Sequence, residues 1–455
     1  MSSINQPSDA GGANVVEGNV ANDFAVWDTV TGTYIPKTVA ETQAILGVNN
    51  TAWGVMLDQD APSVCSPYQL IAGTLVGTDY SPLSIPYFNF VRPVLVQSVE
   101  GEPVVHCELN HSDFTKDIAG DAVAQDGSDG QFMVEFPKAY IRMWRDGTKD
   151  YYLLSHEPFP GSSVHPAFVR SGVERDYRYM SMFEGVEASA AGVPVDYATD
   201  ATADMAVDAK LFSVPGYHPK VLSGRETFRA AALRTGSCFH QQDAWLSDFL
   251  AVCMYVYGKT FDTQTFLPGY TDVTTWAQTM IRKTGRAGGA RLGSIVADAT
   301  LDADLVTAGK LSIGDGKAIA NSFLWVENIF GHIYKWGDGE NWLWTDEPSA
   351  TVYRCDDPAS FADDTATGYT VAADPPLLAS GYFLRTIPGT LLPELGGAGT
   401  TTGYCDYFYS YAGNAWRAPR LGGNAAIGAI AGVACRSTNL AFADRYSNIG
   451  GRLAC

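Results

Sequence analysis

The last part of the chain, residues 414–455, is rich in glycine and alanine and has no helical period. Small residues there separate single bulky or polar side chains, so the backbone can turn tightly and pack closely. Aromatic and arginine side chains on such a background offer a large contact area at little ordering entropy, which favours recognition. A closing sheet with ordinary exposed polar residues is the alternative interpretation. The candidate contact residues are Trp416, Arg417, Arg420, Asn424, Arg436, Asn439, Phe442, Arg445 and Tyr446.

Length and composition limit the classes of protein that this chain can belong to. The chain has 455 residues, which at about 150 residues per domain predicts roughly three units. A net charge of -20 disfavours nucleic acid and anionic membranes as partners. No segment reaches the ~18 apolar residues that a membrane span needs. The first residues lack the basic head and the apolar core of a secretory signal, so we expect none there.

The cysteines and acidic residues do not form a recognisable metal site or catalytic site. The eight cysteines are spread along the chain without a CxxC cluster, which favours free thiols over a disulfide framework. The acidic loop Asp117–Asp129 lacks the regular ligand ladder of a Ca²⁺ site and is predicted to be solvated. We therefore predict no metal, no cofactor and no catalytic residues.

Residues 1–50 are predicted to form an N-terminal arm and attachment module. Residues 1–22 are too polar to order themselves, and a hairpin over 24–37 is expected to turn near Gly32. The capping box Thr38–Glu41 predicts a short helix that Gly47 ends. Because so short a helix is marginal in water, this unit is expected to pack against copies of itself or another protein.

Residues 51–150 are predicted to form a β-rich domain, and residues 151–455 an α+β domain. The first region contains short β runs and a hairpin turn at Arg145–Lys149. In the second, a capping box at Ser223–Glu226 opens a helix that Gly236 ends. Asp243 caps another that stops at Gly258. Both helices are expected to bury one face.

The chain after these helices is predicted to return to β structure. The run Phe323–Trp336 is expected to be an alternating strand with His332, Tyr334 and Trp336 on one side. Residues 346–375 are predicted to be a loop. The order of strands, two helices and strands predicts a two-helix α+β domain with mixed antiparallel sheets.

Several segments from Gly130 onward resemble one group of proteins. The segment Glu327–Gly339 (ENIFGHIYKWGDG) and the ending Ser447–Leu453 (SNIGGRL) resemble the C-type-lectin-fold group of formylglycine-generating enzymes and diversity-generating-retroelement variable proteins. Val134–Tyr140, His165–Val169 and Tyr177–Gly185 are similar to phage tail-fibre and receptor-binding proteins built on that fold. The resemblance implies a C-type-lectin-like domain over 151–455, with residues 416–446 in the position of the ligand-facing segment.

The resemblance has three departures. The Ca²⁺-binding and sugar-binding patterns of animal C-type lectins are incomplete at Glu340 and Glu347. Cys435 lies in a matching stretch, but no second cysteine stands at the short spacing that a formylglycine-generating enzyme needs. Alanine and glycine dominate where retroelement variable regions are dense in Asn, Tyr and Ser. These departures disfavour calcium-dependent sugar binding and cysteine oxidation, and they leave active diversification open.

The functional hypothesis from the sequence is a virion tail-fibre or spike protein, located on a virion tail or capsid surface. It is expected to bind a host-surface receptor, a protein or a glycan, through the candidate contact residues. It is further expected to be a homo-oligomer, a trimer, joined to other virion proteins by its N-terminal arm. The alternatives are a decoration protein without a ligand and a glycan-acting enzyme on the same fold.

Overall fold

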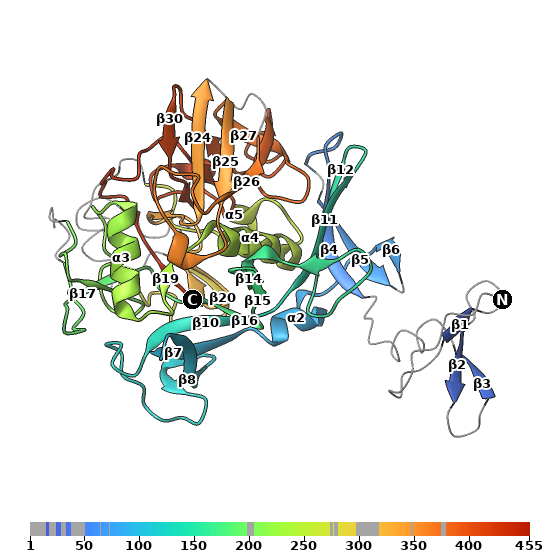
Figure 1. Ribbon diagram of the computed structural model, residues 1–455, viewed down its shortest axis with the longest axis horizontal. Helices are drawn as coiled ribbons and strands as arrows, with labels where there is room; N and C mark the ends of the chain where they lie inside the picture. Colours follow the sequence, from blue (N-terminus) through green and yellow to red (C-terminus); the bar gives the residue numbers. More distant parts are fainter. Residues whose placement is uncertain are drawn as a thin grey trace.

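Strands from distant parts of the chain share sheets, and one buried helix lies among those sheets (Figure 1). The structure is a computed structural model that describes residues 15–17, 24–28, 33–37, 51–63, 65–71, 73–197, 204–273, 276, 281–296, 318–346, 349–374 and 379–455. The chain is 38% strand and 13% helix. The predicted α+β fold with a two-helix C-type-lectin-like domain is therefore wrong, because the molecule is predominantly β.

Two sheets are built mainly from the first half of the chain. Sheet I has six strands in the order β13 (Ser163–Val164), β11 (Tyr140–Asp146), β12 (Lys149–Ser155), β4 (Ala52–Asp58), β5 (Cys65–Ile71) and β6 (Thr74–Gly77). Sheet II has seven, in the order β19 (His240–Gln241), β34 (Leu453–Ala454), β16 (Tyr177–Ser181), β10 (Gln131–Pro137), β7 (Arg92–Val99), β8 (Glu102–Asn110) and β9 (Asp113–Asp117).

Two further sheets come from the second half. Sheet III has seven strands in the order β28 (Pro393–Gly396), β27 (Gly381–Thr386), β29 (Tyr407–Tyr409), β32 (Arg436–Ser437), β31 (Arg420–Leu421), β23 (Tyr334–Trp336) and β33 (Ile449–Gly450). Sheet IV has four, in the order β26 (Thr370–Ala373), β25 (Ser349–Arg354), β24 (Glu340–Asp346) and β30 (Ala415–Arg417). β25 and β26 lie where the sequence predicts a loop, so that prediction is wrong.

The remaining elements are small. The described α-helices are α2 (Pro86–Asn89), α3 (Arg225–Thr235), α4 (Ala244–Gly258) and α5 (Thr263–Phe266). The 3₁₀ turns are η1 (Pro82–Ser84), η2 (Pro166–Phe168), η4 (Pro358–Ser360) and η5 (Gly428–Ile430). Smaller sheets join β14 (Val169–Arg170) to β15 (Val173–Glu174), β17 (Val186–Ala188) to β18 (Lys210–Phe212), and β20 (Leu292–Val296) to β21 (Ala318–Phe323) and β22 (Val326–Glu327). Among the residues described, no helix is long and apolar enough to cross a membrane.

The N-terminal hairpin is confirmed. A separate three-stranded sheet consists of β1 (Val15–Glu17), β2 (Phe24–Asp28) and β3 (Thr33–Lys37). β2 and β3 are antiparallel, and Asp28 pairs with Thr33 next to the turn. The helix predicted after Thr38 lies outside the described residues. The hairpin between β11 and β12 is also confirmed, since Asp146 pairs with Lys149 across its turn.

The predicted boundary at residue 150 does not separate two cores. β10, from the region before 150, pairs on one side with β7 and on the other with β16. β34, at the end of the chain, pairs with β16 and β19 in the same sheet. Residues 51–150 and 151–455 therefore share sheet II and are packed as one body.

Helix α4 lies at the centre of this body. Its cap is as predicted, because the Asp243 side chain accepts a hydrogen bond from the Leu246 N–H at 2.8 Å. The helix runs through Gly258 and ends at Lys259, which takes a left-handed conformation with φ 54°. Nearly every side chain of α4 is buried, so the predicted single buried face is wrong. A helix apolar all round belongs in a core.

Aromatic rings connect α4 to the sheets around it. Phe249 contacts Phe136 of sheet II with ring centroids 5.9 Å apart. Tyr255 contacts Tyr152 of sheet I at 6.3 Å and Tyr404 at 6.3 Å. The hydroxyls of Tyr152 and Tyr404 are 2.6 Å apart and hydrogen-bonded. Segments far apart in the sequence therefore meet on one helix.

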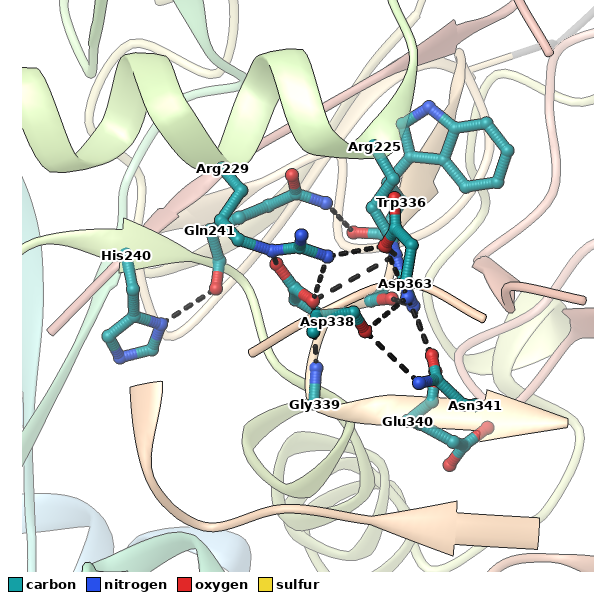
Figure 2. A network of polar contacts seen from close by, with 12 residues as sticks. Arg225, Arg229, His240, Gln241, Trp336, Asp338, Gly339, Glu340, Asn341 and Asp363 are labelled. Atoms are coloured by element: carbon teal, nitrogen blue, oxygen red, sulfur yellow. Dashed lines mark hydrogen bonds and ion pairs between the residues drawn. The ribbon is translucent and has the colours of Figure 1, made fainter. Parts of the chain in front are cut away.

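The cap of α3 differs from the predicted capping box. The N-cap is Gly224, without a side-chain cap, and the Ser223 hydroxyl instead accepts a hydrogen bond from the Met205 N–H. The helix ends at Gly236 as predicted. Its position is fixed by the polar network in Figure 2, where Arg225 donates to Asp363 and Arg229 pairs with both Asp338 and Asp363.

The run Phe323–Trp336 is not one strand. It breaks into β21, β22 and β23 because Leu324, Trp325, Asn328, Gly331 and His332 all have positive φ. Side chains on both sides of the run are buried, His332, Tyr334 and Trp336 as well as Ile333 and Lys335.

A second buried charge network fixes this run. The Glu184 carboxylate lies 2.9 Å from the Lys335 ammonium and also contacts His332. Burial raises the pKa of Glu184, but the nearby cations outweigh that effect and hold it at about 2. Glu327 differs, because burial outweighs its stabilising contacts, which include backbone hydrogen bonds from Gly285 and Ala287. Burial raises the pKa of Glu327 to about 7.

Replacing Trp336 with alanine is expected to destabilise the fold strongly. Trp336 is fully buried and donates its indole N–H to the Ser223 carbonyl. Trp336→Ala should lower the free energy of unfolding by about 3–5 kcal/mol, measured by denaturant titration. Leu233→Ala, at an exposed position of α3, is the control and should cost below about 0.5 kcal/mol. Equal losses would show that Trp336 is not part of the core.

The raised pKa of Glu327 predicts a pH-dependent stability. Between about pH 4.5 and 7 the unfolded chain loses this proton while the folded chain keeps it, so the contribution of Glu327 to stability falls as pH rises. The loss should reach about 3 kcal/mol above pH 7. Glu327→Gln should remove it, so the stability of wild type relative to this variant should decline from pH 5 to pH 8. A difference independent of pH would contradict the assignment.

Candidate recognition surface

Three tyrosines form a row across the outer face of sheet III. Tyr382 of β27 stands directly opposite Tyr407 of β29, and Tyr409 lies two residues further along β29. The rings of Tyr382 and Tyr407 are perpendicular at 5.1 Å, and those of Tyr407 and Tyr409 are 4.6 Å apart. All three side chains are partly exposed. We call these residues the tyrosine row.

The strand alternation explains why the row faces outward. Phe383 and Phe408, the neighbours of row members, are buried on the opposite face. That inner face packs toward α4 in one core, whereas the outer face is covered near β23 by α3. Near β27 and β29 the outer face carries the partly exposed rings of the tyrosine row. Burial raises the pKa of Tyr409 to about 12, so its hydroxyl remains a hydrogen-bond donor at neutral pH.

Arg420 continues the row toward the covered side of the sheet. Ser437 pairs with Tyr409 on one side and with Arg420 on the other, so all three lie on the outer face. The Arg420 guanidinium stacks 4.6 Å over the Tyr334 ring and donates to Ser437 and Asn439. Arg420 is buried, so it supports the row from within.

A second aromatic group lies along β30 and sheet IV. Trp416 contacts the Tyr353 ring at 5.3 Å, and both are partly exposed. The Arg417 guanidinium stacks 3.7 Å over Tyr411, which follows Tyr409 by two residues. β30 and β27 project at the same end of the molecule in Figure 1. We call Tyr353, Tyr411, Trp416 and Arg417 the β30 group.

Four buried charges lie beneath the inner face of sheet III. Asp248 of α4 accepts hydrogen bonds from Arg354 at 2.7 Å and from Arg436 at 2.9 Å. Glu340 pairs with the same two arginines at 2.6 and 3.2 Å. Burial raises the pKa of Asp248, but the two arginines outweigh it and hold the pKa below its usual range. We call these residues the four-charge cluster.

The candidate contact residues predicted from the sequence differ in how exposed they are in the structure. Arg420, Asn424 and Arg436 are buried, and their predicted role as outward contacts is therefore wrong. The physical reason is that each side chain finds its polar partners inside the protein. Arg445 and Tyr446 are exposed, and the others are partly exposed, namely Trp416, Arg417, Asn439 and Phe442.

Two of these residues are held away from the tyrosine row. The Phe442 ring packs under the Arg225 guanidinium at 4.8 Å, and its carbonyl accepts the Arg225 N–H at 2.9 Å. Arg445 forms an ion pair with Asp204 at 2.7 Å. The candidate contact residues therefore do not form one continuous surface.

The tyrosine row is not among the candidate contact residues predicted from the sequence. Its signal is present in residues 407–411, where tyrosine alternates with other residues (YFYSY). Alternation with period two places these rings on one face of a strand. The partner Tyr382 stands on a separate strand, and only the pairing of β27 with β29 brings it to the row.

A broad polar groove of about 710 Å³ lies elsewhere, between α2 and β16, and bears on the enzyme alternative. It contains Glu108 and Glu135 together with the exposed rings of Phe90 and Tyr177. Arg92 bridges the two carboxylates at 3.0 and 2.6 Å. Both carboxylates are therefore tied to one cation, whereas the glycosidase alternative needs one carboxylic acid and one separate carboxylate.

No family model matches the chain, and a search of curated proteins found no relative. Across the described residues, no group of three or more His, Cys, Asp or Glu side chains is arranged to hold a metal ion.

The four-charge cluster is expected to be essential for the stability of sheet III. Arg436→Met keeps the volume but leaves Asp248 and Glu340 with a single buried cation, which should cost about 3–5 kcal/mol of unfolding free energy. Arg445→Met is the matched control, because its ion pair is exposed and should contribute below about 1 kcal/mol. Denaturant titration of both variants measures the two losses of unfolding free energy. Similar small losses would mean that the buried cluster does not hold the sheet.

Proposed function

We propose that this chain is a recognition protein of a virion fibre or spike, and that it binds a host-surface receptor through the tyrosine row. The single observation that carries this proposal is a row of partly exposed tyrosines on the outer face of a sheet whose inner face is fixed by buried charges. The β30 group extends the contact area at the same end of the molecule.

Tyrosine suits this role for physical reasons. Its ring offers a large contact area and loses little conformational entropy on binding, and its hydroxyl supplies a hydrogen bond. Mutual ring contacts hold Tyr382, Tyr407 and Tyr409 before any ligand arrives, which reduces the entropy cost of binding further. The same surface chemistry fits a protein or a glycan, and both remain within the proposal.

The virion setting rests on the resemblance of short segments to phage fibre proteins and on the N-terminal sheet. In this proposal, residues 1–50 join the chain to other virion proteins and to copies of itself in a trimer. Several copies of a modest binding surface then act together, and avidity raises the overall affinity.

Binding of labelled protein to intact bacterial cells tests the proposal. The fluorescent full chain is titrated on a panel of species and followed by flow cytometry. On any species bound, replacing Tyr382, Tyr407 and Tyr409 together by alanine should weaken binding at least about tenfold, because aromatic anchors dominate such interfaces. The folded state of the variant is checked by its thermal transition.

Tyr68→Ala supplies the matched control. Tyr68 is also partly exposed and also contacts a second tyrosine ring, but it belongs to sheet I. Its replacement should leave cell binding unchanged. Absence of binding on every species would favour a decoration protein without a ligand, and equal loss in both variants would remove the tyrosine row from the proposal.

A further inference from the structure

One face of sheet II contributes polar side chains to the groove between α2 and β16. Arg92 of β7, Glu135 of β10 and Tyr179 of β16 stand directly opposite one another on neighbouring strands, so their side chains share that face. Further along β7 and β10, Val94 and Met133 lie on the same face and belong to the core that contains the buried apolar residues of α3. The face is therefore covered near α3, and beyond it Arg92 and Glu135 line the groove.

The polar side chains of this face hold one another in place. Arg92 donates to Glu135 at 2.6 Å and to Glu108 at 3.0 Å, and the Tyr179 hydroxyl donates to Glu135 at 3.0 Å. The Glu135 side chain is buried, whereas those of Arg92 and Glu108 are 39% and 25% exposed. The groove therefore presents a planar guanidinium and a carboxylate whose positions are set before a ligand binds, which lowers the entropy cost of binding.

Two exposed aromatic rings line the same groove. Phe90 is 52% exposed, and its ring lies 5.0 Å from the ring of His156, another residue of the groove. Tyr177 is 49% exposed and pairs with Pro137 at the start of β16. Two such rings in one concave site offer surfaces on which the flat face of a ligand can stack.

The charges of the groove favour an uncharged ligand. The carboxylates that line it outnumber the cations, with Glu108, Glu135, Glu157 and Asp176 against Arg92 and Lys138. An anionic ligand would therefore meet an excess of like charge. A cationic ligand would find most of the carboxylates already paired, since Arg92 bridges two of them and Lys138 lies 3.1 Å from Asp176. A ligand with hydroxyl groups can use these donors and acceptors without a charge of its own.

We propose that this groove binds a neutral saccharide. A pyranose ring has an apolar C–H face that stacks on an aromatic ring, and a rim of hydroxyls that both donate and accept hydrogen bonds. Phe90 and Tyr177 supply the stacking surfaces, and Arg92 and Glu108 supply partners for the hydroxyls. The volume of about 710 Å³ lies within the roughly 300–1,000 Å³ of small-ligand sites.

This saccharide site is separate from the tyrosine row. The row stands on sheet III, whereas the groove is built from sheet II and the segments next to it. The two proposals are tested by different measurements, because one concerns whole cells and the other purified saccharides. Failure of either one leaves the other standing.

Binding of the fluorescent full chain to an array of neutral and acidic oligosaccharides tests the proposal. The neutral saccharide that binds most strongly is then titrated by calorimetry. Phe90→Ala and Tyr177→Ala should each weaken its binding at least about fivefold, because each removes a stacking surface. Tyr446→Ala is the matched control and should bind as wild type does, since Tyr446 is similarly exposed, at 50%, but lies outside the groove. The thermal transition of each variant shows that it is folded.

The salt dependence of binding tests the ligand class. Affinity for the neutral saccharide should change less than about twofold between about 0.05 M and about 0.5 M NaCl, because salt has no ion pair with the ligand to screen. Binding to acidic saccharides alone, or a severalfold loss of affinity in high salt, would overturn the neutral ligand. Absence of binding to every neutral saccharide of the array, or unchanged binding in both ring variants, would overturn the site itself.

Discussion

The four-charge cluster is the interaction on which the arrangement of the second half depends. Two carboxylates and two guanidiniums are taken out of water, which costs free energy unless their geometry is well satisfied. Asp248 stands on the central helix, Arg354 and Glu340 on sheet IV, and Arg436 on sheet III. Any shift of one sheet against α4 would leave a buried charge without its partner. The cluster therefore fixes both sheets to the helix.

This fixation also decides which residues reach the surface. Arg436 points to the inner face of β32, and the next residue, Ser437, faces outward beside Tyr409. A slip of one residue in a strand exchanges its two faces. Such a slip in β32 would turn Arg436 outward and Ser437 inward. The buried charges thus fix the face of β32, the strand that pairs with β29 of the tyrosine row.

The sequence predicted local elements better than their arrangement. The β11–β12 hairpin, the Asp243 cap and the end of α3 at Gly236 are confirmed, because each depends on residues next to one another in sequence. The fold class was wrong, since many strands are only two or three residues long and carry too little alternation to be recognised. The one-face expectation for α4 failed for a related reason. Which sheets surround a helix is a property of the whole chain.

The candidate site was predicted less well, again for a physical reason. Arg436 stands on a background of small residues and resembles an exposed contact group, but its partner Asp248 lies 188 residues away. Local sequence does not report such a partner. Tyr446 is exposed and Trp416 is partly exposed, as expected of outward-facing side chains.

The C-terminal segment joins the sheets of this protein. Between residues 415 and 454 the chain contributes one strand to sheet IV, then three to sheet III, and finally β34 to sheet II. Arg452, between the last two strands, is buried and donates to the Ser181 carbonyl and to the backbone of Glu327. Small residues in this segment allow the chain to pass from one sheet to the next. Its buried arginines donate hydrogen bonds to the segments that it passes. The proposed recognition role therefore falls mainly to the tyrosines that this segment supports.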